Sequence, residues 1–322
     1  MRYRNIPGTT LNPSALCLGT AHFGSSIDEK DCFELLDTFI NEGGNFIDTA
    51  HVYGNWAPGC NGASEKVIGR WLAARRNRDR IIIATKGAHP ELSTMHIPRL
   101  SRQEIMADLD ESLQYLQTDY IDLYWLHRDD PSRPVDDILQ TLNEQVKAGK
   151  IRYFGCSNWT VPRISEAMEY AKHHRLKGFI ADQMMWSLAV PNVDVIQDKT
   201  LVPMDDKIME LHRNTHLAAI PYSSQAQGFF TKLVDAKGDI GRLKEDVRNL
   251  YYNDTNISRL QKVQRLAEDL NRTVTEIALA YLISQPFVTV PIIGCKNVSQ
   301  LTQSLKAGDL LLDEDMVAYL EG

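Results

Sequence analysis

Eight short apolar runs alternate along this chain with longer segments in which apolar residues recur at helical spacing. Strands that are covered by helices on both faces have continuous apolar runs of this kind. Two of the longer segments open with the capping-box pattern of a helix start, at Ser101 and at Thr273. The chain therefore predicts a repeated unit of a strand followed by a helix. The expected strands are residues 15–20, 46–50, 81–87, 120–127, 152–158, 179–185, 217–224 and 288–294.

The number and order of these units favour a closed parallel barrel, the α/β architecture called the (β/α)8 TIM barrel. An open sheet that binds a dinucleotide usually carries G-x-G-x-x-G after its first strand, and residues 19–24, GTAHFG, do not match. No linker or low-complexity tract divides the chain, so we expect a single barrel domain over residues 1–322. An N-terminal β-hairpin in the first dozen residues is expected to plug one end, with extra helices near the C-terminus.

Composition narrows the class of function. The net charge of −7 argues against general binding to nucleic acid or anionic membranes. The five cysteines are scattered without a C-x-x-C pair, which favours neither a disulfide framework nor a zinc cluster. No apolar run reaches the length of a membrane span, and the first residues lack a signal-peptide core. We expect a cytoplasmic protein that acts on a small molecule, and self-association as a homo-oligomer stays open.

Polar side chains stand at the carboxyl ends of three neighbouring strands. Asp48 lies near the end of the second expected strand, Tyr53 just beyond it, Lys86 at the end of the third and His127 at the end of the fourth. Each residue alone has a structural explanation, such as a half-buried tyrosine or a lysine whose stem packs on apolar surface. Because chemistry in a TIM barrel collects at this end of the strands, the four together predict one active site.

The segments FIDTAHVYG, ATKG and DLYWLH, which carry these four residues, resemble the catalytic segments of the aldo-keto reductase family. The resemblance continues in order from LCLGT to PIIGCKN and LLDEDM, over nearly the whole chain, and is greatest to bacterial-type members with a short C-terminus. It implies a TIM barrel that reduces an aldehyde or ketone with a nicotinamide cofactor in extended form. The missing G-x-G-x-x-G agrees with this implication, because the family holds its cofactor at the barrel mouth.

The residue types suit the reduction of a carbonyl group. Hydride addition leaves negative charge on the carbonyl oxygen, and a proton donor held there stabilises that charge. Tyr53 is the expected donor, and the ammonium of Lys86 is expected to lower the pKa of its phenol from about 10. Asp48 is expected to keep Lys86 charged, and His127 to hydrogen-bond the carbonyl oxygen and orient the substrate.

The resemblance also implies a set of cofactor contacts. Lys296 falls near the adenosine end, where an ammonium meets the extra phosphate of NADPH, so we expect NADPH over NADH with use of both allowed. Ser224 and Gln225 replace a proline and a leucine that are common in the family, and Ser304 replaces a usual asparagine. The implied contacts are Gly19, Thr20 and Ala21 through the backbone, Asp48 beside the nicotinamide, Ser157, Asn158 and Gln183 on the carboxamide, Tyr222 stacked on the ring, Ser223, Gln225, Gln227, Gly228 and Phe229 along the pyrophosphate, and Gly294, Lys296, Gln300 and Ser304 around the adenosine.

The longest irregular stretches, residues 55–63 and 226–255, both follow strands. The first brings Trp56 close to Tyr53, while Arg128 follows the fourth strand and Trp186 the sixth. Indole faces mixed with charged groups suit a polyhydroxylated ligand, so these three residues predict a sugar-like or otherwise polar carbonyl substrate. An alternative stays open, in which Arg128 and the next two aspartates only form a solvated, salt-bridged turn.

Two other functions compete with carbonyl reduction. The first is a metal-dependent barrel hydrolase in which His22, Asp48, His51, His127 and Asp129 converge on an ion, although no H-x-H or H-E-x-x-H spacing is present. The second is a non-enzymatic nicotinamide-binding regulatory subunit. The metal hypothesis gives no role to Lys86 or Tyr53, so we expect no metal site, and the second hypothesis is separated from the enzyme by an assay for NADPH consumption.

Overall fold

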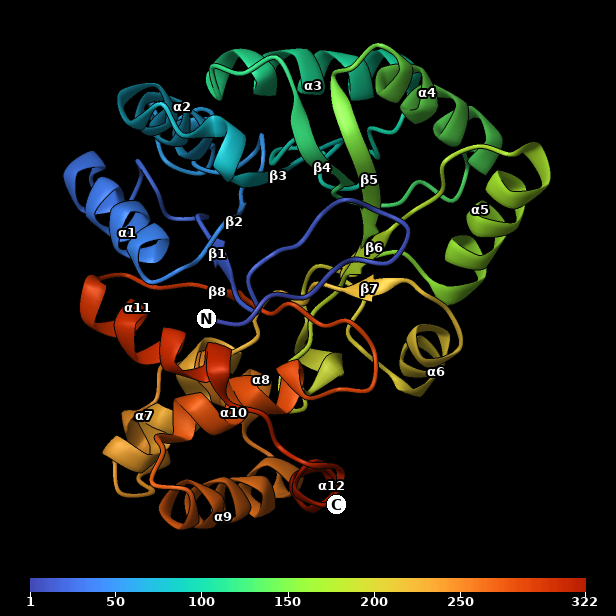
Figure 1. The fold of residues 1–322 in the computed structure, drawn as a ribbon. Coiled ribbons are helices and arrows are strands. Elements are labelled where there is room, and N and C mark those ends of the chain that lie inside the picture. The colour runs from blue at the N-terminus through green and yellow to red at the C-terminus, as the bar shows by residue number, and fades with distance from the viewer.

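The computed structural model describes residues 1–322 and contains all eight expected strands, each parallel to its neighbours, in the order β7-β6-β5-β4-β3-β2-β1-β8. The strands curve around a common axis with the helices outside them (Figure 1). The (β/α)8 barrel is therefore confirmed. The strands are β1 (Cys17–Gly19), β2 (Phe46–Asp48), β3 (Ile82–Gly87), β4 (Ile121–Leu126), β5 (Ile151–Ser157), β6 (Ala181–Gln183), β7 (Ala218–Ala219) and β8 (Ile292–Ile293).

The ring is joined between β7 and β8 by an offset contact. Ala219 of β7 forms a parallel bridge with Thr289, and its backbone N–H donates to the carbonyl of Val288 at 2.8 Å. Both strands are shorter than expected from the sequence. Pro221 and Pro291 explain this, because a proline has no N–H to donate to a neighbouring strand.

The helices follow the strands as expected. At Ser101 the capping box is present, since the Glu104 N–H donates to Ser101 Oγ and the Ser101 N–H donates to Glu104 Oε2 at 2.9 Å. The helices are α1 (Glu29–Asn41), α2 (Ala63–Arg75), α3 (Arg102–Tyr115), α4 (Val135–Lys147), α5 (Val161–His174), α6 (Asp206–Asn214), α7 (Phe229–Asp235), α8 (Glu245–Tyr251), α9 (Asp254–Asp269), α10 (Val274–Ile283), α11 (Val298–Leu305) and α12 (Glu314–Glu321).

Residues 226–255 are not irregular, which corrects the expectation from the sequence. They contain the short helices α7 and α8, which lie with α9, α10 and α12 beside the barrel (Figure 1). Phe229, Leu233, Val247 and Tyr251 are buried in one apolar cluster with residues of α9 and α10. Burial of these apolar side chains stabilises helices that are too short to be stable alone.

The barrel interior is filled by side chains that include two from the N-terminal segment. Ile6 and Leu11 are buried with Phe46, Leu123 and other strand residues in one cluster. The N-terminal segment crosses one end of the barrel (Figure 1). Its hairpin has one antiparallel bridge, between Tyr3 and Ser14, and backbone hydrogen bonds from Arg4 to Pro13 and from Ile6 to Leu11. The expected plug is therefore present, without extended strands.

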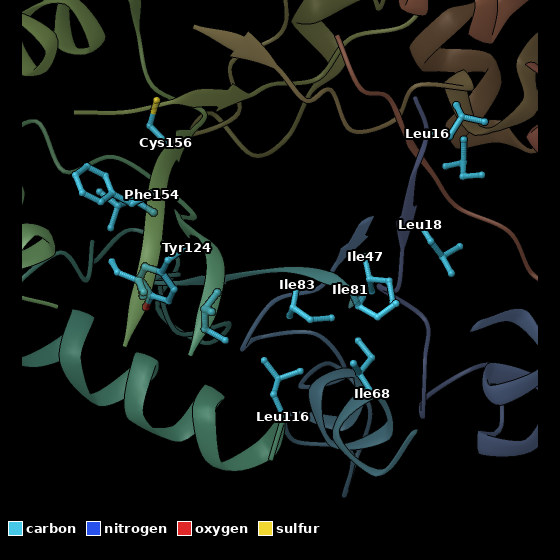
Figure 2. Packing of buried hydrophobic residues seen from close by; sticks show 14 of the residues in the cluster. Leu16, Leu18, Ile47, Ile68, Ile81, Ile83, Leu116, Tyr124, Phe154 and Cys156 are labelled. Atoms are coloured by element: carbon cyan, nitrogen blue, oxygen red, sulfur yellow. The ribbon is translucent and has the colours of Figure 1, made fainter. Parts of the chain in front are cut away.

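A larger apolar cluster lies between the strands and the surrounding helices. Figure 2 shows Leu18, Ile47 and Ile83 of the strands together with Ile68 of α2 in this cluster. Packing on both faces fixes the positions of the strands, and with them the residues at their carboxyl ends. No helix of the structure is both long and apolar enough to cross a membrane.

Candidate active site

Lys86 is the centre of a buried polar cluster at the carboxyl ends of β2 and β3. Only 1% of its side chain is exposed, and its ammonium donates to three acceptors. These are Asp48 Oδ2 at 2.5 Å, the carbonyl of Thr49 at 2.8 Å and Tyr53 Oη at 2.9 Å. Since an ammonium has three hydrogens and no acceptor, every donor of Lys86 is used inside the protein.

Asp48 is held from its other oxygen as well. Trp125 Nε1 donates to Asp48 Oδ1 at 3.1 Å, and Gln183 Nε2 donates to the same oxygen at 3.0 Å. Trp125 lies on β4 and Gln183 on β6, so three strands fix one carboxylate. A buried ion pair with its remaining lone pairs satisfied is held in one geometry.

The buried charges of Asp48 and Lys86 shift the pKa values of the side chains in this cluster. Burial alone would lower the pKa of Lys86, but the adjacent carboxylate of Asp48 raises it, so the ammonium is maintained. Burial also raises the pKa of Tyr53, and this effect outweighs the lowering by Lys86. Lys86 thus lowers the pKa of the phenol, as expected, but burial leaves the net pKa above its usual value. Tyr53 therefore stays protonated at neutral pH.

His127 completes the group of four side chains predicted from the sequence. Its ring meets the edge of Tyr53 with centroids 6.0 Å apart and an interplanar angle of 78°. Burial, and then the charges of His89 and Arg128, hold the pKa of His127 well below its usual value. The imidazole is therefore neutral at neutral pH, and its Nδ1 is buried without a hydrogen-bond partner in the protein. The structure thus brings Asp48, Tyr53, Lys86 and His127 together at one end of the barrel.

Side chains from β5, β6 and the residues after β7 form a network beside Asp48. Ser157 Oγ donates to the carbonyl of Gln183 at 2.8 Å and accepts from Asn158 Nδ2 at 3.0 Å. Asn158 Oδ1 accepts from Tyr222 Oη at 2.7 Å and from the Val202 N–H at 3.1 Å. One N–H of Asn158 and the Oε1 acceptor of Gln183 have no partner in this network.

The segment after β7 has an unusual backbone. Ser223, Gln227 and Gly228 have φ of 55°, 53° and 78°, in the left-handed region. Gln225 Nε2 donates to Ser304 Oγ at 3.0 Å, which ties this segment to α11. Phe229 is fully buried in the apolar cluster that contains Leu233 and Tyr251.

Lysines gather where the adenosine end was predicted. Lys296 is exposed, and its N–H donates to Gln300 Oε1 at 2.9 Å. Lys232 Nζ donates to the carbonyl of Gln227 at 2.6 Å. Burial and then the charges of Lys244 and Lys296 lower the pKa of Lys232, which places these cations within electrostatic range of one another.

Glycine positions near these groups leave the backbone accessible. A side chain at Gly294 would meet no atom within 4 Å, so the backbone there borders open space. A Cβ at Gly19 would lie 2.6 Å from the side chain of Ile292, so this position requires glycine or a shift of that isoleucine. Thr20 donates from Oγ1 to the Asp48 carbonyl at 2.9 Å, and Ala21 follows it at the partly exposed surface.

Two of the three predicted substrate residues lie near Tyr53. The ring of Trp56, which is 48% exposed, has its centroid 6.1 Å from that of Tyr53. Arg128 is buried and acts electrostatically on Tyr53, and its Nη2 donates to Asp198 Oδ2 at 3.0 Å. Trp186 is buried elsewhere, with its ring 6.2 Å from Tyr281 in the apolar cluster of α7 to α10. The structure does not bring Trp186 to the four side chains.

The two aspartates after Arg128 have partners within the protein. Asp129 Oδ2 accepts from Arg163 Nε at 3.1 Å, and Asp130 Oδ1 accepts from Ser132 Oγ at 2.6 Å. Both carboxylates are therefore paired, as the alternative expected, but the turn is buried and not solvated, and Arg128 pairs with Asp198 instead.

The residues proposed for a metal ion do not converge. His51 Nε2 lies 2.5 Å from Glu111 Oε2, Asp129 is paired with Arg163, and Asp48 is bound to Lys86. No group of three or more histidine, cysteine, aspartate or glutamate side chains has the arrangement of a metal site. A cavity of about 700 Å³ lies beside Lys296 and the start of α1, and none of the four central side chains lines it.

Three polar residues near the site were not predicted from the sequence. His89 contacts His127, with ring centroids 4.6 Å apart. Trp125 was findable, because it lies two residues before His127 and alternation along a strand directs both to one face. His89 follows Lys86 by three residues, which was a weaker signal. Lys232 lies on a helix that the sequence did not predict.

Comparisons with known proteins show the family of the chain. Residues 15–322 match the model of the aldo/keto reductase family. The chain is 30% identical over 325 residues to the uncharacterized oxidoreductase YrpG of Bacillus subtilis, covering 99% of this chain and 95% of the relative. It is 31% identical to norsolorinic acid reductase B of Aspergillus parasiticus, covering 99% and 83%. It is 27% identical to the aryl-alcohol dehydrogenase [NADP(+)] of Phanerodontia chrysosporium, covering 99% and 85%. The chain belongs to the aldo/keto reductase family, and is an oxidoreductase.

Proposed function

We propose that this protein reduces an aldehyde or ketone to the alcohol with NADPH, and that Tyr53 is the general acid. The observation that carries the proposal is the saturated cluster around Lys86, which holds one phenol beside a neutral histidine. When bound, the nucleotide supplies the hydride. The protein supplies the proton, the alignment of the carbonyl group and the exclusion of water.

The direction of the hydrogen bonds around Tyr53 supports the proposal that its phenolic hydrogen is transferred to the substrate. Lys86 only donates, so Tyr53 Oη accepts from it, and the hydrogen of Tyr53 is left for another acceptor. A carbonyl oxygen between Tyr53 and His127 would receive that hydrogen as negative charge develops on it. Lys86 then stabilises the phenolate that remains, and Asp48 keeps Lys86 charged.

The donors and acceptors near Asp48 fit a carboxamide. Asn158 retains one N–H and Gln183 retains Oε1, while a carboxamide offers one acceptor oxygen and N–H donors. Tyr222 presents an aromatic ring whose hydroxyl is already bound to Asn158. Ser157 positions the side chain of Asn158. These four residues would hold the nicotinamide, with Asp48 beside it.

The preference for NADPH rests on cations at the other end. Lys296 and Lys232 lie within electrostatic range, next to the segment from Ser223 to Phe229 and to Gln300. Clustered ammonium groups favour an additional phosphate. Gly19 to Ala21, Gly294 and Ser304, through its bond with Gln225, would contact the rest of the nucleotide. The NADP(+) in the name of one relative supports this preference.

For the substrate, we propose a polar carbonyl compound that contacts Trp56 and lies near Arg128. The exposed indole beside Tyr53 offers a flat apolar face, and Arg128 and Asp198 give polar surroundings. The direct test measures NADPH consumption by purified protein with a panel of aldehydes, ketones and sugars. Turnover of carbonyl compounds supports the enzyme. Tight binding of NADPH without turnover of any of them would instead support a non-enzymatic nicotinamide-binding subunit.

A further inference from the structure

His89 lies directly after β3, against the ring of His127. The two ring centroids are 4.6 Å apart, with an interplanar angle of 66°. Its side chain is almost buried, yet the mechanism above gives it no role. The question is what a second histidine beside the carbonyl-binding histidine can recognise.

The hydrogen bonds of His89 determine which of its nitrogens carries the hydrogen. Nδ1 lies 2.6 Å from the carbonyl oxygen of Pro90. A carbonyl oxygen only accepts, so Nδ1 must be the donor, and in the neutral ring Nε2 then carries a lone pair. Burial and the charge of Arg128 lower the pKa of His89 to about 4, so the ring is neutral at neutral pH.

Nε2 of His89 is free to bind a ligand. It makes no hydrogen bond within the protein, and it is not among the fully buried polar atoms that lack a partner, so it reaches open space. A neutral nitrogen with a lone pair accepts a hydrogen and repels an anion. A hydroxyl group is therefore the partner that suits it, whereas a carboxylate, a phosphate or a second carbonyl oxygen is not.

We infer that His89 binds a hydroxyl group on the carbon next to the substrate carbonyl, and that the protein therefore prefers α-hydroxy aldehydes or α-hydroxy ketones. The inference rests on the proposed carbonyl reduction at Tyr53 and His127. Because the rings of His89 and His127 are in contact, the two groups they bind must be close neighbours in the substrate. Two oxygens on adjacent carbons meet that requirement.

The test compares two substrates that differ only in that hydroxyl group. Hydroxyacetone and butan-2-one have the same number of heavy atoms, as do glycolaldehyde and propanal. We expect the wild type to have the higher kcat/KM for the hydroxylated member of each pair. His89→Phe retains a ring but has no acceptor, and should lower that preference about tenfold, as the loss of one buried hydrogen bond does.

Two further variants keep the test decisive. His89→Gln offers an acceptor at a similar reach and should retain part of the preference. His96→Phe removes an exposed histidine in the same loop that forms no hydrogen bond, and should change nothing. If the wild type turns over both members equally, or if His89→Phe and His89→Gln leave the ratio unchanged, the inference is wrong while carbonyl reduction stands. Failure to reduce any carbonyl compound would instead overturn the proposed function and the inference with it.

Discussion

Lys86 donates a hydrogen bond of 2.9 Å to Tyr53 Oη, and its other two hydrogens go to Asp48 and Thr49. The phenol therefore accepts a hydrogen bond from the protein, and its own hydrogen is left for the proposed substrate. Burial keeps Tyr53 protonated, while Lys86 favours the phenolate that forms when the proton leaves. The arrangement stabilises charge that is present only after proton transfer, which is how a catalytic group lowers a barrier.

Replacing Lys86 by methionine should lower kcat about 100-fold, because the phenolate loses its stabilising ammonium. It should also lower the free energy of unfolding by about 3–5 kcal/mol, since Asp48 is left buried without its cation. Steady-state kinetics and urea unfolding measure the two effects. Lys172→Met, on the exposed surface of α5, is the matched control and should change neither quantity.

A double variant separates the chemical from the structural effect of Lys86. Lys86→Met combined with Asp48→Asn removes both charges, so part of the lost stability should return while turnover stays low. Wild-type kcat in either variant would remove Lys86 from the mechanism.

Trp125 is proposed to position Asp48 through the 3.1 Å hydrogen bond to Oδ1. Trp125→Phe removes the N–H and retains an aromatic ring, and should lower kcat about tenfold with little change in KM. The pH profile of kcat should also shift, because Asp48 then holds Lys86 less firmly. A purely structural role would lower stability and leave the pH profile in place.

The lysines near α11 should set the choice of nucleotide. Lys296→Ala and Lys232→Ala should each weaken binding of NADPH about tenfold and leave NADH nearly unchanged, because only NADPH carries the additional phosphate. Fluorescence titration at fixed salt measures the Kd of each variant for NADPH and for NADH, and the ratio of the two Kd values gives the preference. Equal losses for NADPH and NADH, or a higher kcat/KM with NADH in the wild type, would contradict the assignment.

Glu65 should make the stability of the protein depend on pH. Burial raises its pKa to about 7, while Thr85 Oγ1 donates to Oε1 at 2.5 Å and Oε2 has no partner. The raised pKa means that the folded state retains a proton that the unfolded state releases at about pH 4. The stabilisation is therefore complete below that pH and is lost as the pH rises through about 7.

Glu65→Gln tests this dependence because the amide does not titrate. Between about pH 5 and pH 8 the wild type should lose about 2 kcal/mol of unfolding free energy that the variant keeps. Urea unfolding of both proteins at the two pH values measures the difference. Parallel pH dependences would show that Glu65 is not the group responsible.

Much of the fold followed from local pattern. Each strand is an apolar run, and the two shortest strands, β7 and β8, are limited by Pro221 and Pro291. The helices α7 and α8 were missed because each is only seven residues long, too short for a periodic pattern to stand out. Their stability comes from contacts with α9 and α10, which are distant in the sequence.

The four central residues were predictable because the barrel topology itself brings strand ends together. Side chains that depend on loop paths were not. Arg128 is paired with Asp198, 70 residues later in the chain, and no local pattern indicates that partner. The prediction for Trp186 failed for a similar reason. Its position beyond β6 does not determine that its ring packs against Tyr281.

The most direct test of the account is the kcat of Tyr53→Phe for an aldehyde that the wild type reduces, measured at saturating NADPH. Removing the hydroxyl leaves the ring in place and removes the proton donor, so kcat should fall at least about 100-fold. The Kd for NADPH should stay within about twofold of wild type, because the hydroxyl acts on the transition state. A variant with wild-type kcat would contradict the assignment of Tyr53 as the general acid.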